Sequence, residues 1–146
     1  MQLSKLIKSN VPATLDSHSI NTEVEEDIYI KGDQEKFLMV LDNLVDNAVK
    51  YSPDSDVVNV ILQSNGDNIK LIVEDHGIGI NENDKEKIYE RFYRSKNSEE
   101  MGIKGYGLGL SLVKTILVEM GANIVIEDNH PSGTRFIITI KALNIA

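Results

Sequence analysis

Residues 32–54 read GDQEKFLMVLDNLVDNAVKYSPD. Asp33 is suited to cap the start of a helix, and Ser52-Pro53-Asp54 is suited to end it. A helix with one apolar stripe must bury that stripe against a sheet or another helix. The stretch therefore predicts one long amphipathic helix at the centre of the fold. The stripe at helical spacing consists of Phe37, Leu41, Leu44, Val45 and Ala48.

The rest of the chain predicts strands and two further helical segments. A tight antiparallel turn is expected at Asn65-Gly66-Asp67. A short helix is expected over residues 84–89, and a longer one over residues 108–120 that ends at Gly121. The order of elements predicts an α/β (α+β) two-layer sandwich, with a mixed, mostly antiparallel sheet of about five strands packed on about three helices. The candidate strands cover residues 15–22, 27–31, 57–63, 69–75, 122–127 and 134–141, and the inward residues of the longer helix are Leu108, Leu112, Ile116 and Leu117.

Composition narrows the function classes. The chain has 146 residues, 41% of them hydrophobic, which fits one core. It has no cysteine, so disulfides and cysteine zinc sites are excluded, and a cytoplasmic setting is expected. The net charge of −8 disfavours nucleic-acid binding, and no apolar run is long enough to span a bilayer, so no direct membrane contact is expected. We expect residues 1–14 to be a connecting segment or the end of an upstream helix, and residues 15–146 to be the domain.

A polar face lies on the long helix, away from the apolar stripe. Asn43, Asn47 and Lys50 are four and three residues apart and share this face, with Tyr51 at its edge. Asparagine is a poor helix former, and an isolated pair is most often just a solvated surface. The alternative is a magnesium and phosphate site, because carboxamide oxygens bind Mg²⁺ and lysine supplies a point charge to phosphates.

A glycine turn follows the predicted strand 69–75. Asp75 closes the apolar row of this strand, and a carboxylate at the edge of a core needs hydrogen-bond donors. An adenine amino group is one such donor, and Gly77 and Gly79 let the backbone approach a flat ring. Alone, the motif is as typical of an ordinary aspartate-glycine turn. His76 is interpreted as a loop residue, and His18 and His130 are lone histidines without partners.

A second glycine cluster, residues 105–110, leads into the helix expected at 108–120. Free amides at a helix start, together with the helix dipole, favour phosphate. The spacing fits neither a dinucleotide fingerprint nor a Walker loop. The preceding residues, 91–107, predict a long mobile loop. Its basic side chains would supply local positive charge to a phosphate, and the alternative is that they only form a solvated charged loop. The basic residues are Arg91, Arg94, Lys96 and Lys104.

Taken in order, these motifs resemble the conserved boxes of sensor histidine kinases. Residues 43–53 resemble the asparagine box, and residues 75–80 the first glycine box. Residues 90–94, Glu-Arg-Phe-Tyr-Arg, resemble the phenylalanine box. Residues 105–110 resemble the second glycine box, and Gly133-Thr134 the last short glycine motif. The resemblance covers residues 32–140.

The resemblance implies a Bergerat ATP-binding fold with a mobile ATP lid, and ATP and Mg²⁺ as cofactors. It assigns Asn47 as the magnesium ligand and Asn47, Lys50 and Arg94 as catalytic residues. Asp75 would bind the adenine amino group, with Thr134 nearby through water. Two positions depart from the usual pattern, since His76 replaces asparagine or threonine and Tyr106 replaces a small polar residue. The nucleotide-binding residues implied are Asn43, Asn47, Lys50, Tyr51, Asp75, Gly77, Gly79, Ile80, Tyr93, Arg94, Gly105, Tyr106, Gly107, Leu108, Gly109, Leu110 and Thr134.

The same ATP fold serves type II topoisomerases, mismatch-repair ATPases, a heat-shock chaperone family and anti-sigma serine kinases. In those relatives a glutamate one turn before the magnesium asparagine acts as general base, and here that position is Asn43. The difference favours a protein histidine kinase of a two-component system over a hydrolase, and a nucleotide-binding module without activity is the third alternative. None of the three histidines is followed by an acidic residue, so the phosphoacceptor is expected on a missing dimerisation domain. A response regulator receiver domain would follow downstream. We expect the isolated domain to be a monomer and the full-length protein a homodimer.

Overall fold

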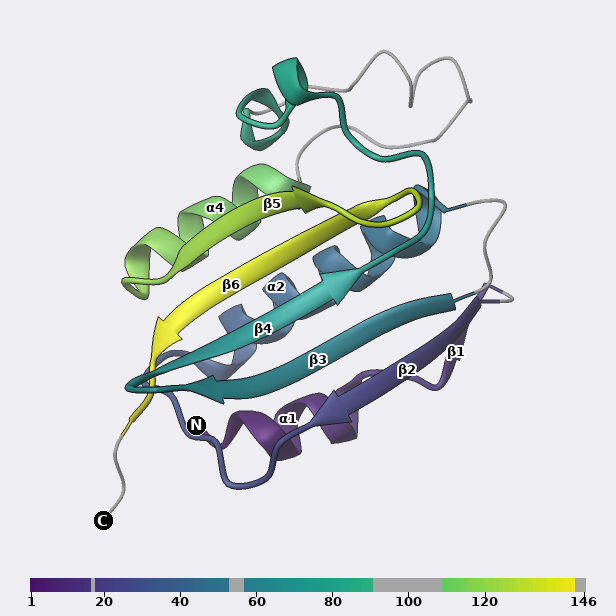
Figure 1. The fold of residues 1–146 in the computed structure, drawn as a ribbon. Helices are drawn as coiled ribbons and strands as arrows, with labels where there is room; N and C mark the ends of the chain where they lie inside the picture. Colours follow the sequence, from purple (N-terminus) through teal and green to yellow (C-terminus); the bar gives the residue numbers. More distant parts are fainter. Residues whose placement is uncertain (17, 53–56, 91–108, 144–146) are drawn as a thin grey trace.

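The computed structural model describes residues 1–16, 18–52, 57–90 and 109–143. In these residues a single mixed sheet is covered by helices on one face (Figure 1). Two short 3-10 turns, η1 (Glu82–Asp84) and η2 (Lys87–Tyr89), follow the fourth strand in the sequence. The helices are α1 (Leu3–Asn10), α2 (Gln34–Lys50) and α4 (Gly109–Glu119), and the strands are β1 (Thr14–Leu15), β2 (His18–Val24), β3 (Val57–Asn65), β4 (Asn68–Glu74), β5 (Asn123–Asp128) and β6 (Thr134–Lys141).

The sheet has the strand order β1-β2-β3-β4-β6-β5. Only β2 and β3 run parallel among these neighbours, and α2 is the crossover that joins them. The other pairs are antiparallel, and β3 and β4 form the hairpin expected around Gly66, whose φ is +66°. The predicted two-layer α+β sandwich is confirmed, with six strands in place of about five.

The apolar stripe of α2 forms the centre of the core. Asp33 accepts a hydrogen bond from the Lys36 amide, so it caps the helix as predicted. All five residues of the predicted stripe are buried. Alternate residues of the strands face them because side chains on a strand point to opposite faces at successive positions. The strand residues of this core cluster are Ile20, Val58, Val60, Leu62, Ile69, Leu71, Val73, Ile124, Phe136, Ile138 and Ile140.

Helix α1 packs into the same core. Leu3 and Ile7 are fully buried and Leu6 nearly so. The Ser4 hydroxyl donates to the Glu25 carbonyl and accepts from the Ile28 amide, which ties α1 to the segment after β2. The predicted role of residues 1–14 as a connecting segment stays a prediction. No helix within the described residues has the length and hydrophobicity to cross a membrane.

Two strand predictions near the N-terminus were wrong in detail. Residues 15–22 form two strands, because Asp16, with φ +48°, reverses the chain between β1 and β2. Aspartate is one of the few residues that tolerate this left-handed conformation. Residues 27–31 form no strand, and Tyr29 only makes an isolated bridge to Gln2. The backbone of this short segment bonds the first residues of the chain in place of a strand of the sheet.

Two helix predictions also need correction. Leu112 was expected inward but is 38% exposed, while its neighbour Val113 is fully buried. The orientation of α4 is set by its packing on α2 and β5, which a periodic apolar pattern alone does not fix. Residues 84–89 form parts of the two 3-10 turns in place of one helix. Leu108 lies outside the described residues, and Gly121, with φ +70°, ends α4 as predicted.

If α1 is part of the domain core, Ile7→Ala should lower the free energy of unfolding by about 2–5 kcal/mol, since it leaves a cavity in a packed site. Urea denaturation followed by circular dichroism measures this. Lys5→Ala is the matched control on the exposed side of α1 and should change stability by less than about 0.5 kcal/mol. Equal effects of the two substitutions would contradict the packing of α1 described here.

Candidate functional site

The C-terminal end of α2 and the loop after β4 are in direct contact. The Ile78 amide donates to the Tyr51 carbonyl at 3.0 Å. A Cβ atom added to Gly77 would lie 1.8 Å from that same carbonyl oxygen, so only glycine fits there. Two of the predicted motifs, far apart in sequence, therefore meet at one place at the end of the sheet.

Asp75 lies at this meeting point and is 3% exposed. Its amide donates to the Thr134 carbonyl at 3.0 Å. Its carboxylate Oδ1 accepts from the amides of Gly77, at 2.9 Å, and Thr134, at 3.3 Å. No described residue donates to Oδ2, so one carboxylate oxygen is left for a ligand. A donor that approaches Oδ2 would complete the hydrogen bonding of a buried acid.

Burial raises the pKa of Asp75 from 3.8 to about 6, because the ionised form loses solvation. The amides of Gly77 and Thr134 and the nearby His76 ring partly oppose this rise. At neutral pH the carboxylate is therefore mostly ionised, but a change of about one pH unit alters its charge. A hydrogen-bond donor from a ligand would lower the pKa again.

The last glycine motif packs against the same aspartate. A Cβ atom at Gly133 would lie 2.0 Å from the Asp75 carbonyl oxygen, and one at Gly79 would lie 3.5 Å from the Gly133 carbonyl oxygen. Thr134 is buried beside Asp75, and Ile80 packs against the edge of the core. The structure thus brings together the predicted residues Tyr51, Asp75, Gly77, Gly79, Ile80 and Thr134.

The predicted phosphate-site residues Asn43, Asn47 and Lys50 lie on α2, which ends just before Tyr51. The backbone carbonyl of Asn47 accepts from the Tyr51 amide at 2.9 Å. The Asn47 side chain has no hydrogen-bond partner among the described residues, so the carboxamide oxygen is available. Asn43 donates to the Met39 carbonyl at 2.7 Å, and its Oδ1 lies 2.7 Å from where a Cβ of Gly109 would be. The start of α4 therefore packs on Asn43. Lys50 forms an ion pair with Asp46 at 2.7 Å, one helical turn earlier.

The predicted lid residues fall mostly outside the part of the chain that the structure describes. They are Tyr93, Arg94, Gly105, Tyr106, Gly107 and Leu108, whereas Gly109 and Leu110 begin α4. The roles that the family resemblance implies for all these site residues remain predictions.

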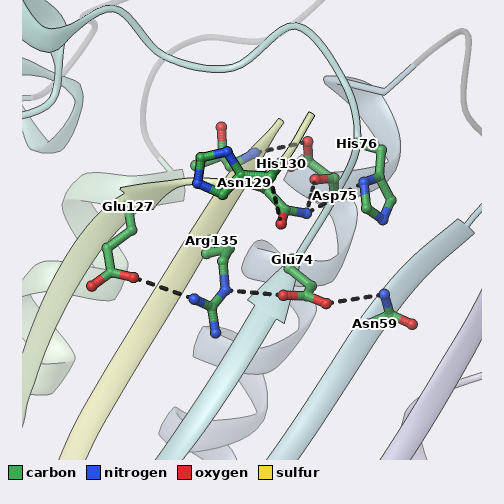
Figure 2. A network of polar contacts seen from close by, with 9 residues as sticks. Asn59, Glu74, Asp75, His76, Glu127, Asn129, His130 and Arg135 are labelled. Carbon is green, nitrogen blue, oxygen red and sulfur yellow. Dashed lines mark hydrogen bonds and ion pairs between the residues drawn. The ribbon is translucent and has the colours of Figure 1, made fainter. Parts of the chain in front are cut away.

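Figure 2 shows a bond to the Asp75 carbonyl and a row of polar pairs that the sequence did not indicate. Asn129, in the turn between β5 and β6, donates to the Asp75 carbonyl at 2.8 Å. A polar ladder also crosses the end of the sheet, where Arg135 bonds Glu74 and Glu127, and Asn59 bonds Glu74. An asparagine in a turn carries no signal of its own, because turns favour asparagine for backbone reasons.

Comparison with known proteins identifies the fold family. Residues 32–144 match the family described as histidine kinase-, DNA gyrase B-, and HSP90-like ATPase. The chain belongs to this family. Its six-stranded sheet with helices on one face is the family's Bergerat fold, and ATP is the nucleotide that the family name implies.

Curated proteins similar to this chain include sensor kinases. The chain is 33% identical over 124 residues to the sensor-like histidine kinase SenX3 of Mycobacterium tuberculosis (strain ATCC 25618 / H37Rv). It is 35% identical over 118 residues to the sensor histidine kinase WalK of Bacillus subtilis (strain 168). The matches cover 85% and 80% of this chain but only 30% and 19% of the two relatives.

Solved structures of the family agree. The mycobacterial sensor histidine kinase MprB superposes with a TM-score of 0.84 at 25% identity, covering 99% of this chain and 97% of that one. The catalytic domain of histidine kinase ThkA, in a nucleotide-free form, gives 0.79 at 26% identity and covers 97% and 93%. The predicted resemblance to sensor histidine kinases is confirmed.

Asp75→Asn should weaken ATP binding by about tenfold or more, because the asparagine NH₂ would take the place of Oδ2 and face another donor. In the wild-type protein, ATP affinity should also fall as the pH drops through about 6, since protonation of the raised-pKa carboxylate removes the acceptor. Isothermal titration of both proteins from pH 5 to 8 measures this. The titration of ATP itself is common to both proteins, so an identical pH profile in the variant would contradict the assignment.

Proposed function

We propose that this chain is the catalytic domain of a sensor histidine kinase, which binds Mg-ATP and transfers its γ-phosphoryl group to a histidine of a separate domain. One observation supports the proposal: the C-terminal end of α2, at Tyr51, contacts the loop that follows the buried Asp75, and no described residue donates to the second oxygen of that carboxylate. A carboxylate acceptor for a base and polar groups for phosphates are what a nucleotide site requires.

Asn47 fits the role of magnesium ligand. Its carboxamide oxygen is a hard ligand that has no hydrogen-bond partner within the described residues. The described residues hold no cluster of three or more acidic, histidine or cysteine side chains that could bind a metal. A metal here would therefore take most of its ligands from phosphate oxygens and water, which is the coordination that Mg²⁺ prefers. Mg²⁺ would neutralise charge on the phosphates.

Asn43 favours a kinase over a hydrolase. It lies one helical turn before Asn47, packs on Gly109 and bonds the Met39 carbonyl. A carboxamide cannot accept a proton from water or from a serine hydroxyl, so this position offers no general base. A neutral imidazole needs no such base, because its ring nitrogen already has a lone pair.

Transfer then depends on position and charge. The lone-pair nitrogen of the imidazole would form a bond to the γ-phosphorus, while the bond from that phosphorus to the β,γ-bridging oxygen breaks and ADP leaves. The ring would then release the proton on its second nitrogen to solvent. Lys50 would contact the phosphates, as would Arg94 in the segment outside the described residues. The Asp46–Lys50 pair is half exposed, so breaking it costs little, and a phosphate would replace the carboxylate.

The partners follow from this proposal. The acceptor histidine would lie on a helical dimerisation domain, the full-length protein would be a homodimer, and a response regulator would receive the phosphoryl group. The domain would lie in the cytoplasm, as part of a protein that extends beyond it. The sensor kinases similar to it are several times longer than the matched region, which is consistent with this arrangement.

Asn47→Ala should remove the increase in ATP affinity that Mg²⁺ gives, by about tenfold or more, without unfolding the domain. Alanine is the better helix former, so stability should be retained. ATP titrations with Mg²⁺ and with EDTA measure the difference. Asn123→Ala makes the same change on the exposed start of β5 and serves as the control. Unchanged Mg²⁺ dependence in the Asn47 variant would defeat the metal assignment.

Phosphotransfer can be tested with γ-labelled ATP, this chain and separately supplied helical dimerisation domains of sensor kinases. We expect an acid-labile, base-stable label on an acceptor domain, lost when its histidine is replaced by glutamine, and very slow ATP hydrolysis without it. Rapid hydrolysis with no labelled acceptor would instead indicate an ATPase of the topoisomerase or chaperone type.

A further inference from the structure

The turn between β5 and β6 is built against the backbone of Asp75. The Asn129 amide donates to the Gly133 carbonyl at 3.0 Å, which closes the turn. Gly133 leaves no space between this turn and the Asp75 carbonyl, as a Cβ there would lie 2.0 Å from that oxygen. A movement of the turn would therefore displace the backbone of Asp75.

The Asn129 side chain has a fixed orientation. Its Oδ1 accepts from the His130 amide at 3.0 Å, so its Nδ2 must face the other way. There Nδ2 donates to the Asp75 carbonyl at 2.8 Å and lies 3.4 Å from Nδ1 of His76 (Figure 2). The bond from the His130 amide thus orients the Asn129 carboxamide so that its Nδ2 points at the Asp75 carbonyl.

A second side chain from the same turn bonds the next carbonyl. The Ser132 hydroxyl donates to the His76 carbonyl at 3.1 Å. Two consecutive peptide groups of the loop are therefore held by side chains of the turn. The second of these peptides carries the Gly77 amide, which is the donor to Oδ1 of Asp75.

We propose that Asn129 is a positioning residue for adenine recognition, which holds the Asp75 carboxylate in place through the Asp75 carbonyl. This inference rests on the proposed function, because it concerns the same nucleotide site. The Asp75 amide is fixed by the Thr134 carbonyl, and Asn129 fixes the other side of the residue. Without Asn129 the Asp75 carbonyl loses the side chain that donates to it, and the Ser132 bond to the next carbonyl is left to hold the loop alone, so Asp75 can change its orientation. The free oxygen Oδ2 then loses its fixed direction.

The test compares ATP with purine riboside triphosphate, which lacks the 6-amino group. The ratio of the two dissociation constants measures how strongly the protein reads that group. For the wild type we expect a ratio of about ten or more, since a hydrogen bond to a charged acceptor is lost. Asn129→Ala should lower this ratio at least about fivefold while affinity for the purine analogue changes little. A merely structural role would weaken both nucleotides equally and leave the ratio unchanged.

Two further variants sharpen the experiment. Asn129→Asp keeps the shape and can still accept from the His130 amide, but it cannot donate to the Asp75 carbonyl, so its ratio should fall as well. Asn59→Ala removes another asparagine hydrogen bond, to Glu74 at 3.1 Å, in the neighbouring ladder, and should leave the ratio at its wild-type value.

The outcomes separate the two proposals. If the wild-type protein discriminates between the nucleotides and both Asn129 variants discriminate equally well, the role of Asn129 is refuted and the proposed function stands. If the wild-type protein binds neither nucleotide, or binds both equally, then Asp75 does not read adenine and the proposed site itself is wrong.

Discussion

The proposed nucleotide site depends on the close approach between Gly77 and the Tyr51 carbonyl. This contact joins the end of α2 to the loop after β4, and it exists only because residue 77 has no side chain. The Ile78 amide then bonds the same carbonyl, which also satisfies a helix C-terminus. The end of the helix that carries the polar face and the loop that follows the buried carboxylate are joined by these backbone contacts.

Electrostatics at the site contrast with the charge of the whole chain. A protein with net charge −8 repels a triphosphate at long range, so binding must depend on short-range groups. Asp75 carries a charge that burial disfavours, as its raised pKa indicates, and a donor from the ligand would relieve that cost. Lys50 is held by Asp46 in an exposed pair that is weak enough to exchange partners. In the proposed function, both groups would gain a favourable partner from a bound nucleotide.

The β5–β6 hairpin contributes more than the closing edge of the sheet. Arg135 on β6 forms ion pairs with Glu127 on β5 and with Glu74 on β4. Glu74 directly precedes Asp75. The turn of the hairpin bonds the carbonyl groups of Asp75 and His76. The hairpin thereby supports the loop in addition to α2. Support from rigid elements is what a precise recognition site requires.

The sequence by itself determined the layers and the elements of the site. The apolar stripe of α2, the hairpin around Gly66 and the alternating row that ends at Asp75 are local periodic patterns, and the order of the motifs identified the family. Only the tertiary structure decided that residues 27–31 pair with the N-terminus, that Val113 and not Leu112 faces the core, and that Asn129 holds Asp75. These depend on contacts between segments that are distant in the sequence. A local sequence pattern does not indicate which distant segment will pack against it, and that packing determines the position of each side chain.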